Sequence, residues 1–90
     1  METGLTDKGV LVTGGAGGIG SAIVRAFASE GARVAIHYRS SEERALALAG
    51  EHGGVALRAD LTIESEVDAL VPAAVDRFGR LDVLVANAGM

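Results

Sequence analysis

The chain has 90 residues, of which 49% are hydrophobic and 22% are charged, with a formal net charge of −4. This length suffices for one small folded domain, and the acidic balance disfavours nucleic-acid and anionic membrane partners. The absence of cysteine excludes disulfides and zinc–sulfur sites, and no apolar run reaches the ~18 residues of a membrane span. With no signal-peptide pattern either, we expect a cytoplasmic domain. His37 and His52 lack a matching ligand cluster, so we expect no metal site.

The first predicted element is a strand over Gly9–Thr13, and a glycine-rich stretch and a helix follow it. The apolar stripe of this helix repeats with the spacing expected for one face of a helix, and Gly31 ends the helix. The stripe consists of Ile19, Ala22, Ile23, Ala26 and Phe27.

The second predicted strand covers Arg33–Tyr38, and a second helix begins at Ser40. Ser40 and Glu43 have the spacing of a capping box, and the helix is expected to end near Gly50. All four predicted strands are nearly continuous apolar runs, which is typical of parallel strands covered on both faces.

The third predicted strand covers Gly54–Arg58, and the fourth covers Leu81–Val85. The helix between them contains Pro72, where we expect a kink, and it stops at Gly79. Its apolar stripe consists of Val67, Leu70, Val71, Ala74 and Phe78.

These elements predict an α/β fold in the order β-α-β-α-β-α-β, a doubly wound parallel sheet with strand order 3-2-1-4. The first two helices are expected on one face and the third on the other. The fourth strand, with Val83, Leu84 and Val85, is then an unprotected apolar edge.

The stretch between the first strand and the first helix, TGGAGGIG (Thr13–Gly20), holds five glycines in eight residues. A glycine-rich turn at a helix N-terminus exposes backbone N–H groups and is a ready phosphate site. Gly15, Gly17 and Gly20 fit the general dinucleotide pattern G-x-G-x-x-G, which expects an acidic residue after the second strand where this chain has Tyr38 and Arg39. The alternative pattern is T-G-x-x-x-G-I-G, and a Walker A loop is excluded because no Lys-Ser or Lys-Thr follows.

Three further motifs stand in order along the chain: Arg39-Ser40, Asp60-Leu61, and Ala86-Asn87-Ala88-Gly89. Together with the glycine loop, residues 10–89 resemble the amino-terminal half of the short-chain dehydrogenase/reductase family. This resemblance implies a Rossmann-type NAD(P)-binding half-domain over residues 1–90. The cofactor-binding residues that it implies are Gly14, Ala16, Gly17, Gly18, Ile19, Gly20, Arg39, Ser40, Asp60, Leu61, Asn87, Ala88 and Gly89.

The resemblance also assigns roles within this set. Gly14 is expected to turn the chain off the strand, Gly18 to admit the pyrophosphate and Gly20 to allow close helix–strand contact, whereas Gly15 has no assigned role. Arg39 stands where an acidic residue would favour NAD, so it favours NADP. The alternative is that Arg39 is an ordinary solvated surface residue. Gly17 departs from the pattern, because NADP users often have a second basic residue at that position. Asp60 either binds the adenine amino group or, with Thr62, caps the third helix.

Asn87 is expected to tie the central strands together beside the cofactor ribose, with Thr13 bonded toward it. The family's catalytic Ser and Tyr-x-x-x-Lys are not in this chain: Tyr38 has Glu42 four places on, and the only lysine is Lys8. We therefore expect no catalytic residue here and no activity from the 90 residues alone.

The functional expectation is the cofactor-binding, amino-terminal piece of a longer NADP-preferring carbonyl reductase. The sequence looks most like the 3-oxoacyl-[acyl-carrier-protein] reductase and sugar dehydrogenase branches, and the complete protein is expected to be a homo-oligomer. The alternatives are a stand-alone dinucleotide-binding module without redox chemistry and an inert, partly folded chain.

Overall fold

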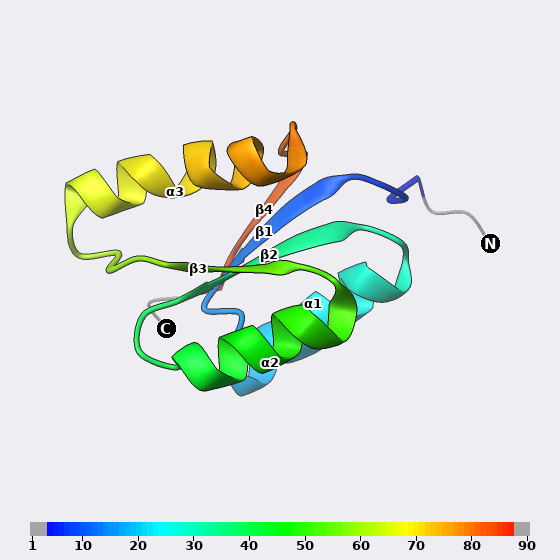
Figure 1. The fold of residues 1–90 in the computed structure, drawn as a ribbon, viewed down its shortest axis with the longest axis horizontal. Coiled ribbons are helices and arrows are strands. Elements are labelled where there is room, and N and C mark those ends of the chain that lie inside the picture. Colours follow the sequence, from blue (N-terminus) through cyan, green and yellow to red (C-terminus); the bar gives the residue numbers. More distant parts are fainter. Residues whose placement is uncertain (1–3, 88–90) are drawn as a thin grey trace.

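The computed structural model describes residues 4–87. Strands and helices alternate along the chain, and the four strands form one parallel sheet in the order β3-β2-β1-β4 (Figure 1). The predicted doubly wound fold and its strand order are confirmed. The elements are β1 (Gly9–Thr13), α1 (Gly18–Ser29), β2 (Arg33–Tyr38), α2 (Glu42–His52), β3 (Val55–Arg58), α3 (Glu64–Phe78) and β4 (Val83–Ala86).

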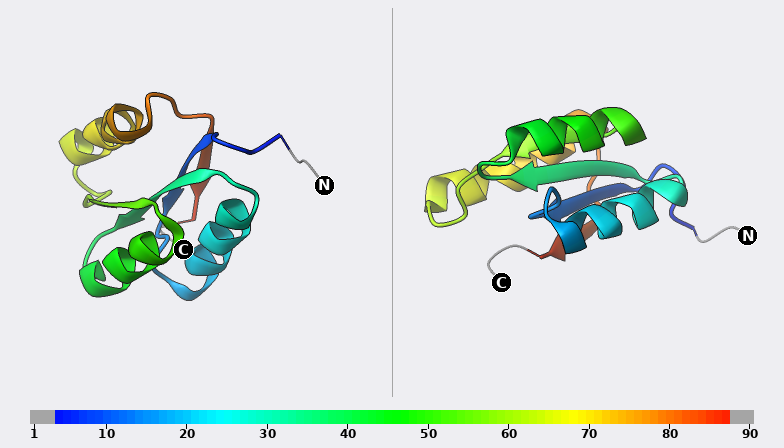
Figure 2. Two further views of the ribbon diagram at one scale, coloured as in Figure 1. Left: turned by 45° about the vertical axis from the view of Figure 1, so that its right-hand side comes forward. Right: turned by 90° about the horizontal axis from the view of Figure 1, so that it is seen from below.

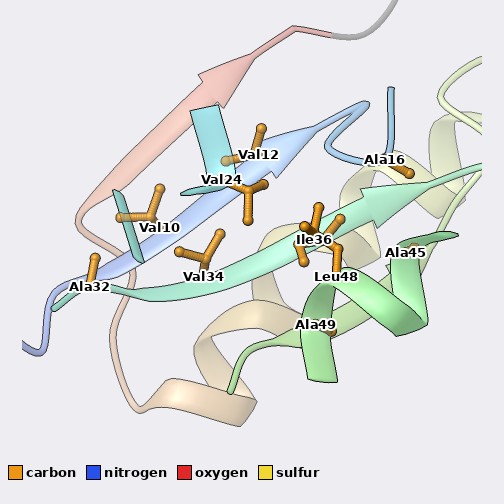
Figure 3. Packing of buried hydrophobic residues seen from close by; sticks show 10 residues of the cluster. All are labelled: Val10, Val12, Ala16, Val24, Ala32, Val34, Ile36, Ala45, Leu48 and Ala49. Atoms are coloured by element: carbon orange, nitrogen blue, oxygen red, sulfur yellow. The ribbon is translucent and has the colours of Figure 1, made fainter. Parts of the chain in front are cut away.

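The sheet is covered by α1 and α2 on one face and by α3 on the other, as expected (Figures 1 and 2). Successive strand residues point to opposite faces, so Val10 and Val12 pack toward α1 and α2 while Leu11 packs toward α3. Figure 3 shows the larger cluster, made of Val10, Val12, Ala16, Val24, Ala32, Val34, Ile36, Ala45, Leu48 and Ala49. The smaller cluster consists of Leu11, Ala35, Ala59, Leu70 and Ala74.

Helix α1 packs only part of the predicted stripe against the sheet: Ile23 and Phe27 contact the larger cluster as predicted, and the other three residues do not. Val24 is fully buried with Gly20, whereas Ile19 is 74% exposed and Ala22 and Ala26 are exposed. The helical period was right, but the buried stripe lies one residue further along the chain, a rotation of about 100° on the helix. Its other members, which pack partly buried against the larger cluster, are Ile23, Phe27 and Ala28.

The predicted capping box of α2 is wrong. The N-cap residue is Ser41 rather than Ser40, and no side chain makes a capping hydrogen bond. The helix also continues past Gly50 to His52, because the residue that takes the left-handed conformation and ends the helix is Gly53, with φ of 67°.

Helix α3 is retained through Pro72 and ends at Gly79, as predicted. Leu70 and Ala74 are buried, and Phe78 packs against them. The prediction was wrong for Val67 and Val71, whose exposed fractions are 40% and 38%. Among residues 4–87 no helix is both long and apolar enough to cross a membrane.

Strand β4 begins at Val83, two residues later than predicted, and Asp82 just before it bonds to Gly9 of β1 through both its backbone N–H and its side chain. The Gly9 N–H donates to Asp82 Oδ2 at 2.9 Å, and Arg80 holds the same carboxylate with two bonds of 2.8 Å each. Hydrogen bonds from Arg80 and from the Gly9 N–H lower the pKa of Asp82. The register of β1 with β4 begins at the Val10–Val83 pair.

Candidate cofactor-binding site

The glycine-rich loop leaves β1 through a turn at Gly14, where φ is 65°, a left-handed conformation that favours glycine. A Cβ on Gly20 would collide with the Gly14 carbonyl and lie 2.8 Å from Gly15 Cα. The close contact expected at Gly20 is thus present, although its partner is the turn after β1 rather than the strand. The loop and the first turn of α1 can lie against each other only without this side chain.

Gly15 has a packing role that the sequence motifs do not indicate. A Cβ here would lie 2.9 Å from Ile36 Cγ2 and 3.3 Å from Val24 Cγ2, so the residue is required where the loop crosses the larger core cluster. Its N–H also donates to the His37 carbonyl at 3.1 Å.

The N-terminus of α1 is suited to an anion. Gly17 is the N-cap residue and offers no side-chain capping bond, so the first-turn N–H groups of Gly18–Gly20 lack a side-chain acceptor there. A Cβ on Gly18 would meet nothing within 4 Å, which leaves open space in front of this turn. Ala16 is buried in the core below the loop, and Ile19 is exposed at the start of the helix.

The loop is tied to the end of β4 through Thr13 and Asn87. The Thr13 hydroxyl donates to the Val85 carbonyl at 3.2 Å and accepts from the Asn87 N–H at 2.9 Å. The Asn87 side-chain amide donates to the Gly14 carbonyl at 3.3 Å. The predicted link between Thr13, Asn87 and the central strands is confirmed, while Ala88 and Gly89 lie outside the described residues.

A pocket of about 450 Å³ opens at the carboxyl ends of β1, β2 and β3. It brings together four of the predicted residues, Gly14, Arg39, Asp60 and Leu61. Its other lining residues, which the sequence analysis did not assign to the site, are His37, Ala59 and Thr62. Ser40 is exposed and does not line this pocket.

Asp60 is held in a fixed orientation at the pocket. Its Oδ1 accepts from the Thr62 N–H at 2.9 Å and from the Thr62 hydroxyl at 2.6 Å, and these two bonds lower the pKa of the carboxyl. Asp60 is therefore a carboxylate at neutral pH, able to accept a hydrogen bond from an amino group. The capping alternative is wrong, because the N-cap residue of α3 is Ile63 and no side chain caps this helix.

Arg39 lines the same pocket as Asp60. Its Nη2 lies 3.6 Å from Asp60 Oδ2, and 68% of its side chain is exposed. The arrangement places one cation and one carboxylate at a partly apolar pocket that also includes Gly14 of the glycine-rich turn. Among the described residues no group of three or more His, Cys, Asp or Glu side chains is arranged to hold a metal ion.

The comparison with known proteins gives one consistent result. A family model described as "short chain dehydrogenase" matches residues 8–90. The chain is 48% identical over 90 residues to an L-fucose dehydrogenase of Bos taurus and 41% identical over 93 residues to a 3-oxoacyl-[acyl-carrier-protein] reductase of Synechocystis. These alignments cover 99% and 98% of this chain but 33% and 38% of the relatives.

Among solved structures, a short chain dehydrogenase from Burkholderia cenocepacia, determined in complex with NADP, superimposes with a TM-score of 0.92 at 42% identity. The match covers 96% of this chain and 37% of that one. The chain thus spans little more than a third of the length of the proteins that it matches.

Proposed function

Because the chain belongs to the short-chain dehydrogenase family, we propose that it supplies the NADP-binding part of an oxidoreductase. The observation that carries the proposal is the position of Arg39 and Asp60 at one pocket beside the open N-terminus of α1. A bound nicotinamide cofactor supplies hydride exchange with a carbonyl or alcohol carbon, and the residues of this chain bind and orient that cofactor.

The residues of the chain fit the parts of a dinucleotide. The first-turn N–H groups of α1 offer donors to the pyrophosphate, and Gly18 leaves room for it. Asp60 can accept from the adenine amino group while Leu61 lines the ring. Asn87 borders the ribose from the end of β4.

Arg39 supports NADP rather than NAD. An arginine there can pair with a 2′-phosphate, whereas an acidic residue would bind the free 2′-hydroxyl and repel the phosphate. Ser40, the next residue in the chain, carries a hydroxyl. The solved relative crystallised with NADP supports the same choice.

We propose a substrate of the 3-oxoacyl-[acyl-carrier-protein] reductase kind for the protein that carries this chain. The similarity to such a reductase supports this, and the similarity to an L-fucose dehydrogenase supports a sugar as the second candidate. Neither class is favoured by a residue of the pocket, because the pocket residues described above face the adenosine half of a dinucleotide.

The test is a titration of the protein that carries this chain with NADPH and with NADH. We expect NADPH to bind more tightly and to raise the unfolding temperature, since a ligand that binds only the folded state stabilises it. Oxidation of NADPH by 3-oxoacyl thioesters and reduction of NADP⁺ by sugars then distinguish the two substrate classes. Absence of binding by either nucleotide contradicts the proposal.

Nucleotide binding without turnover of any carbonyl substrate would instead support the alternative of a binding module. The cytoplasmic location and the homo-oligomeric state stay predictions, and cell fractionation and sedimentation of the expressed protein test them.

A further inference from the structure

His37 is a polar side chain near the end of the otherwise apolar strand β2, and only 2% of it is exposed. Its ring bridges two loops that are far apart in sequence. Nδ1 lies 2.9 Å from the Gly14 nitrogen in the glycine-rich turn, and Nε2 lies 2.8 Å from the Ala59 carbonyl oxygen at the end of β3.

These two partners determine where the ring proton lies. The Gly14 N–H can only donate, so Nδ1 must be an acceptor and carry no proton. The Ala59 carbonyl can only accept, so Nε2 must carry the proton and donate it. The ring is therefore neutral with its proton on Nε2, and no other form satisfies both bonds.

The ring thereby joins the two halves of the candidate cofactor site. Gly14 begins the turn that leads to the phosphate-seating end of α1, and Ala59 precedes Asp60 in the pocket lining. Gly14 is held through its carbonyl as well, which accepts from the Asn87 side-chain amide at 3.3 Å. His37 and Asn87 thus fix Gly14 from β2 and β4.

We propose that His37 is a positioning residue that orders the glycine-rich loop for the dinucleotide, acting through its Nδ1 on the Gly14 N–H. This proposal rests on the cofactor-binding function proposed above. A loop with five glycines in eight residues loses much conformational entropy when it is ordered, so a loop already held by His37 binds its ligand at a smaller entropic cost.

Two substitutions separate the bond to Gly14 from the bond to Ala59. In His37→Asn the amide oxygen takes nearly the place of Nδ1 and can accept from Gly14, but it does not reach Ala59. In His37→Gln the longer amide reaches the place of Nε2 and can donate to Ala59, but it leaves Gly14 without its acceptor. His37→Leu removes both bonds at similar size.

Three measurements on the protein that carries this chain test the proposal. The first is the ¹⁵N spectrum of the His37 ring, which is expected to show the Nε2–H tautomer. The second is hydrogen exchange of the Gly14 amide without nucleotide, and the third is the dissociation constant for NADPH. We expect His37→Asn to keep Gly14 protected and to bind within about threefold of the parent, and His37→Gln and His37→Leu to lose protection and bind roughly tenfold more weakly.

The control is Val34→Ala, which opens a cavity in the same strand, away from Gly14 and Ala59. It is expected to lower the unfolding temperature while leaving NADPH affinity and Gly14 protection unchanged. An Nδ1–H tautomer overturns the proposal, as does equal affinity of the Asn and Gln variants. If the parent itself binds no nucleotide, the cofactor function fails, whereas the tautomer and the Gly14 exchange still decide whether His37 orders the loop.

Discussion

Arg39 and Asp60 form an ion pair of 3.6 Å in which the arginine side chain is mostly exposed. Such pairs contribute little to stability, about 0–1 kcal/mol, because water and salt screen them. Arg39 therefore loses little if it leaves Asp60 to pair with a 2′-phosphate. Asp60 meanwhile keeps its orientation through Thr62, which does not depend on Arg39.

Because the orientation of Asp60 does not depend on Arg39, a substitution at Arg39 tests the contribution of that residue alone. Arg39→Asp is expected to weaken NADPH binding by roughly 10- to 100-fold, through loss of the charge-assisted bonds and repulsion of the phosphate. NADH binding is expected to improve, since a carboxylate can accept from the free ribose hydroxyl. Fluorescence titration with both nucleotides measures the change.

The matched control for Arg39 is Arg33→Asp, which makes the same charge change at the opposite end of β2. Arg33 has one exposed ion-pair partner, Asp7 at 3.8 Å, and lies away from the pocket. The Arg33→Asp variant is expected to keep the nucleotide preference of the parent protein. An unchanged preference in Arg39→Asp would assign Arg39 to the solvated surface instead.

At the residue scale, the motif residues were predictable because their spacing in the sequence carries the information. His37 and Gly15 were not, because their roles arise from contacts between β2 and the loop that only the folded chain creates. One signal was present: a histidine inside an apolar strand must either expose its ring nitrogens to water or find hydrogen-bond partners for them.

At the element scale, β1 and β2 were predicted with the bounds that the structure has, because Gly and charged residues limit their apolar runs. The end of α2 was not: it was predicted near Gly50, whereas the helix continues to His52 and ends at Gly53. Gly53 ends the helix in the left-handed region, whereas Gly50 is an exposed interior residue whose added Cβ would meet nothing within 4 Å. A glycine is therefore favoured at position 53, whereas position 50 can accept a side chain.

That difference predicts opposite effects of the same substitution. Gly50→Ala is expected to raise the free energy of unfolding by about 0.5–1 kcal/mol, because alanine favours the helix and restricts the unfolded chain. Gly53→Ala is expected to lower it by about 1–2 kcal/mol, because its φ of 67° strains an L-residue. Urea unfolding of both variants measures the change, and a destabilising Gly50→Ala would contradict the assignment of Gly50 to the helix interior.

At the scale of the whole molecule, the two faces of the sheet are covered unequally. Two helices lie over one face, while α3 alone lies over the other (Figure 2). This asymmetry was predictable from the order of elements and the handedness of crossovers. Which apolar residues of α3 stay exposed was only partly predictable. The helix has more apolar residues on its predicted stripe than its contact with the sheet buries, and Val67 and Val71 stay exposed.

The α3 side consequently exposes a set of apolar side chains. Val67, Val71 and Val75 recur every four residues along the helix, at 40%, 38% and 38% exposure. Leu84, 53% exposed, is paired in register with Leu11, which faces α3, so Leu84 lies on the same face of the edge strand β4. Exposed apolar residues on an edge strand favour association between copies.

We therefore expect the 90-residue chain, prepared by itself, to self-associate through the α3 face in a concentration-dependent way. Leu84→Lys is expected to lower the average mass in sedimentation equilibrium, because a charge on an edge strand opposes strand pairing. The matched control is Leu46→Lys on α2, since Leu46 has the same 53% exposure but lies on a helix of the opposite face. If both lysines lower the mass equally, general solubility explains the effect, and if neither does, association does not use the β4 edge.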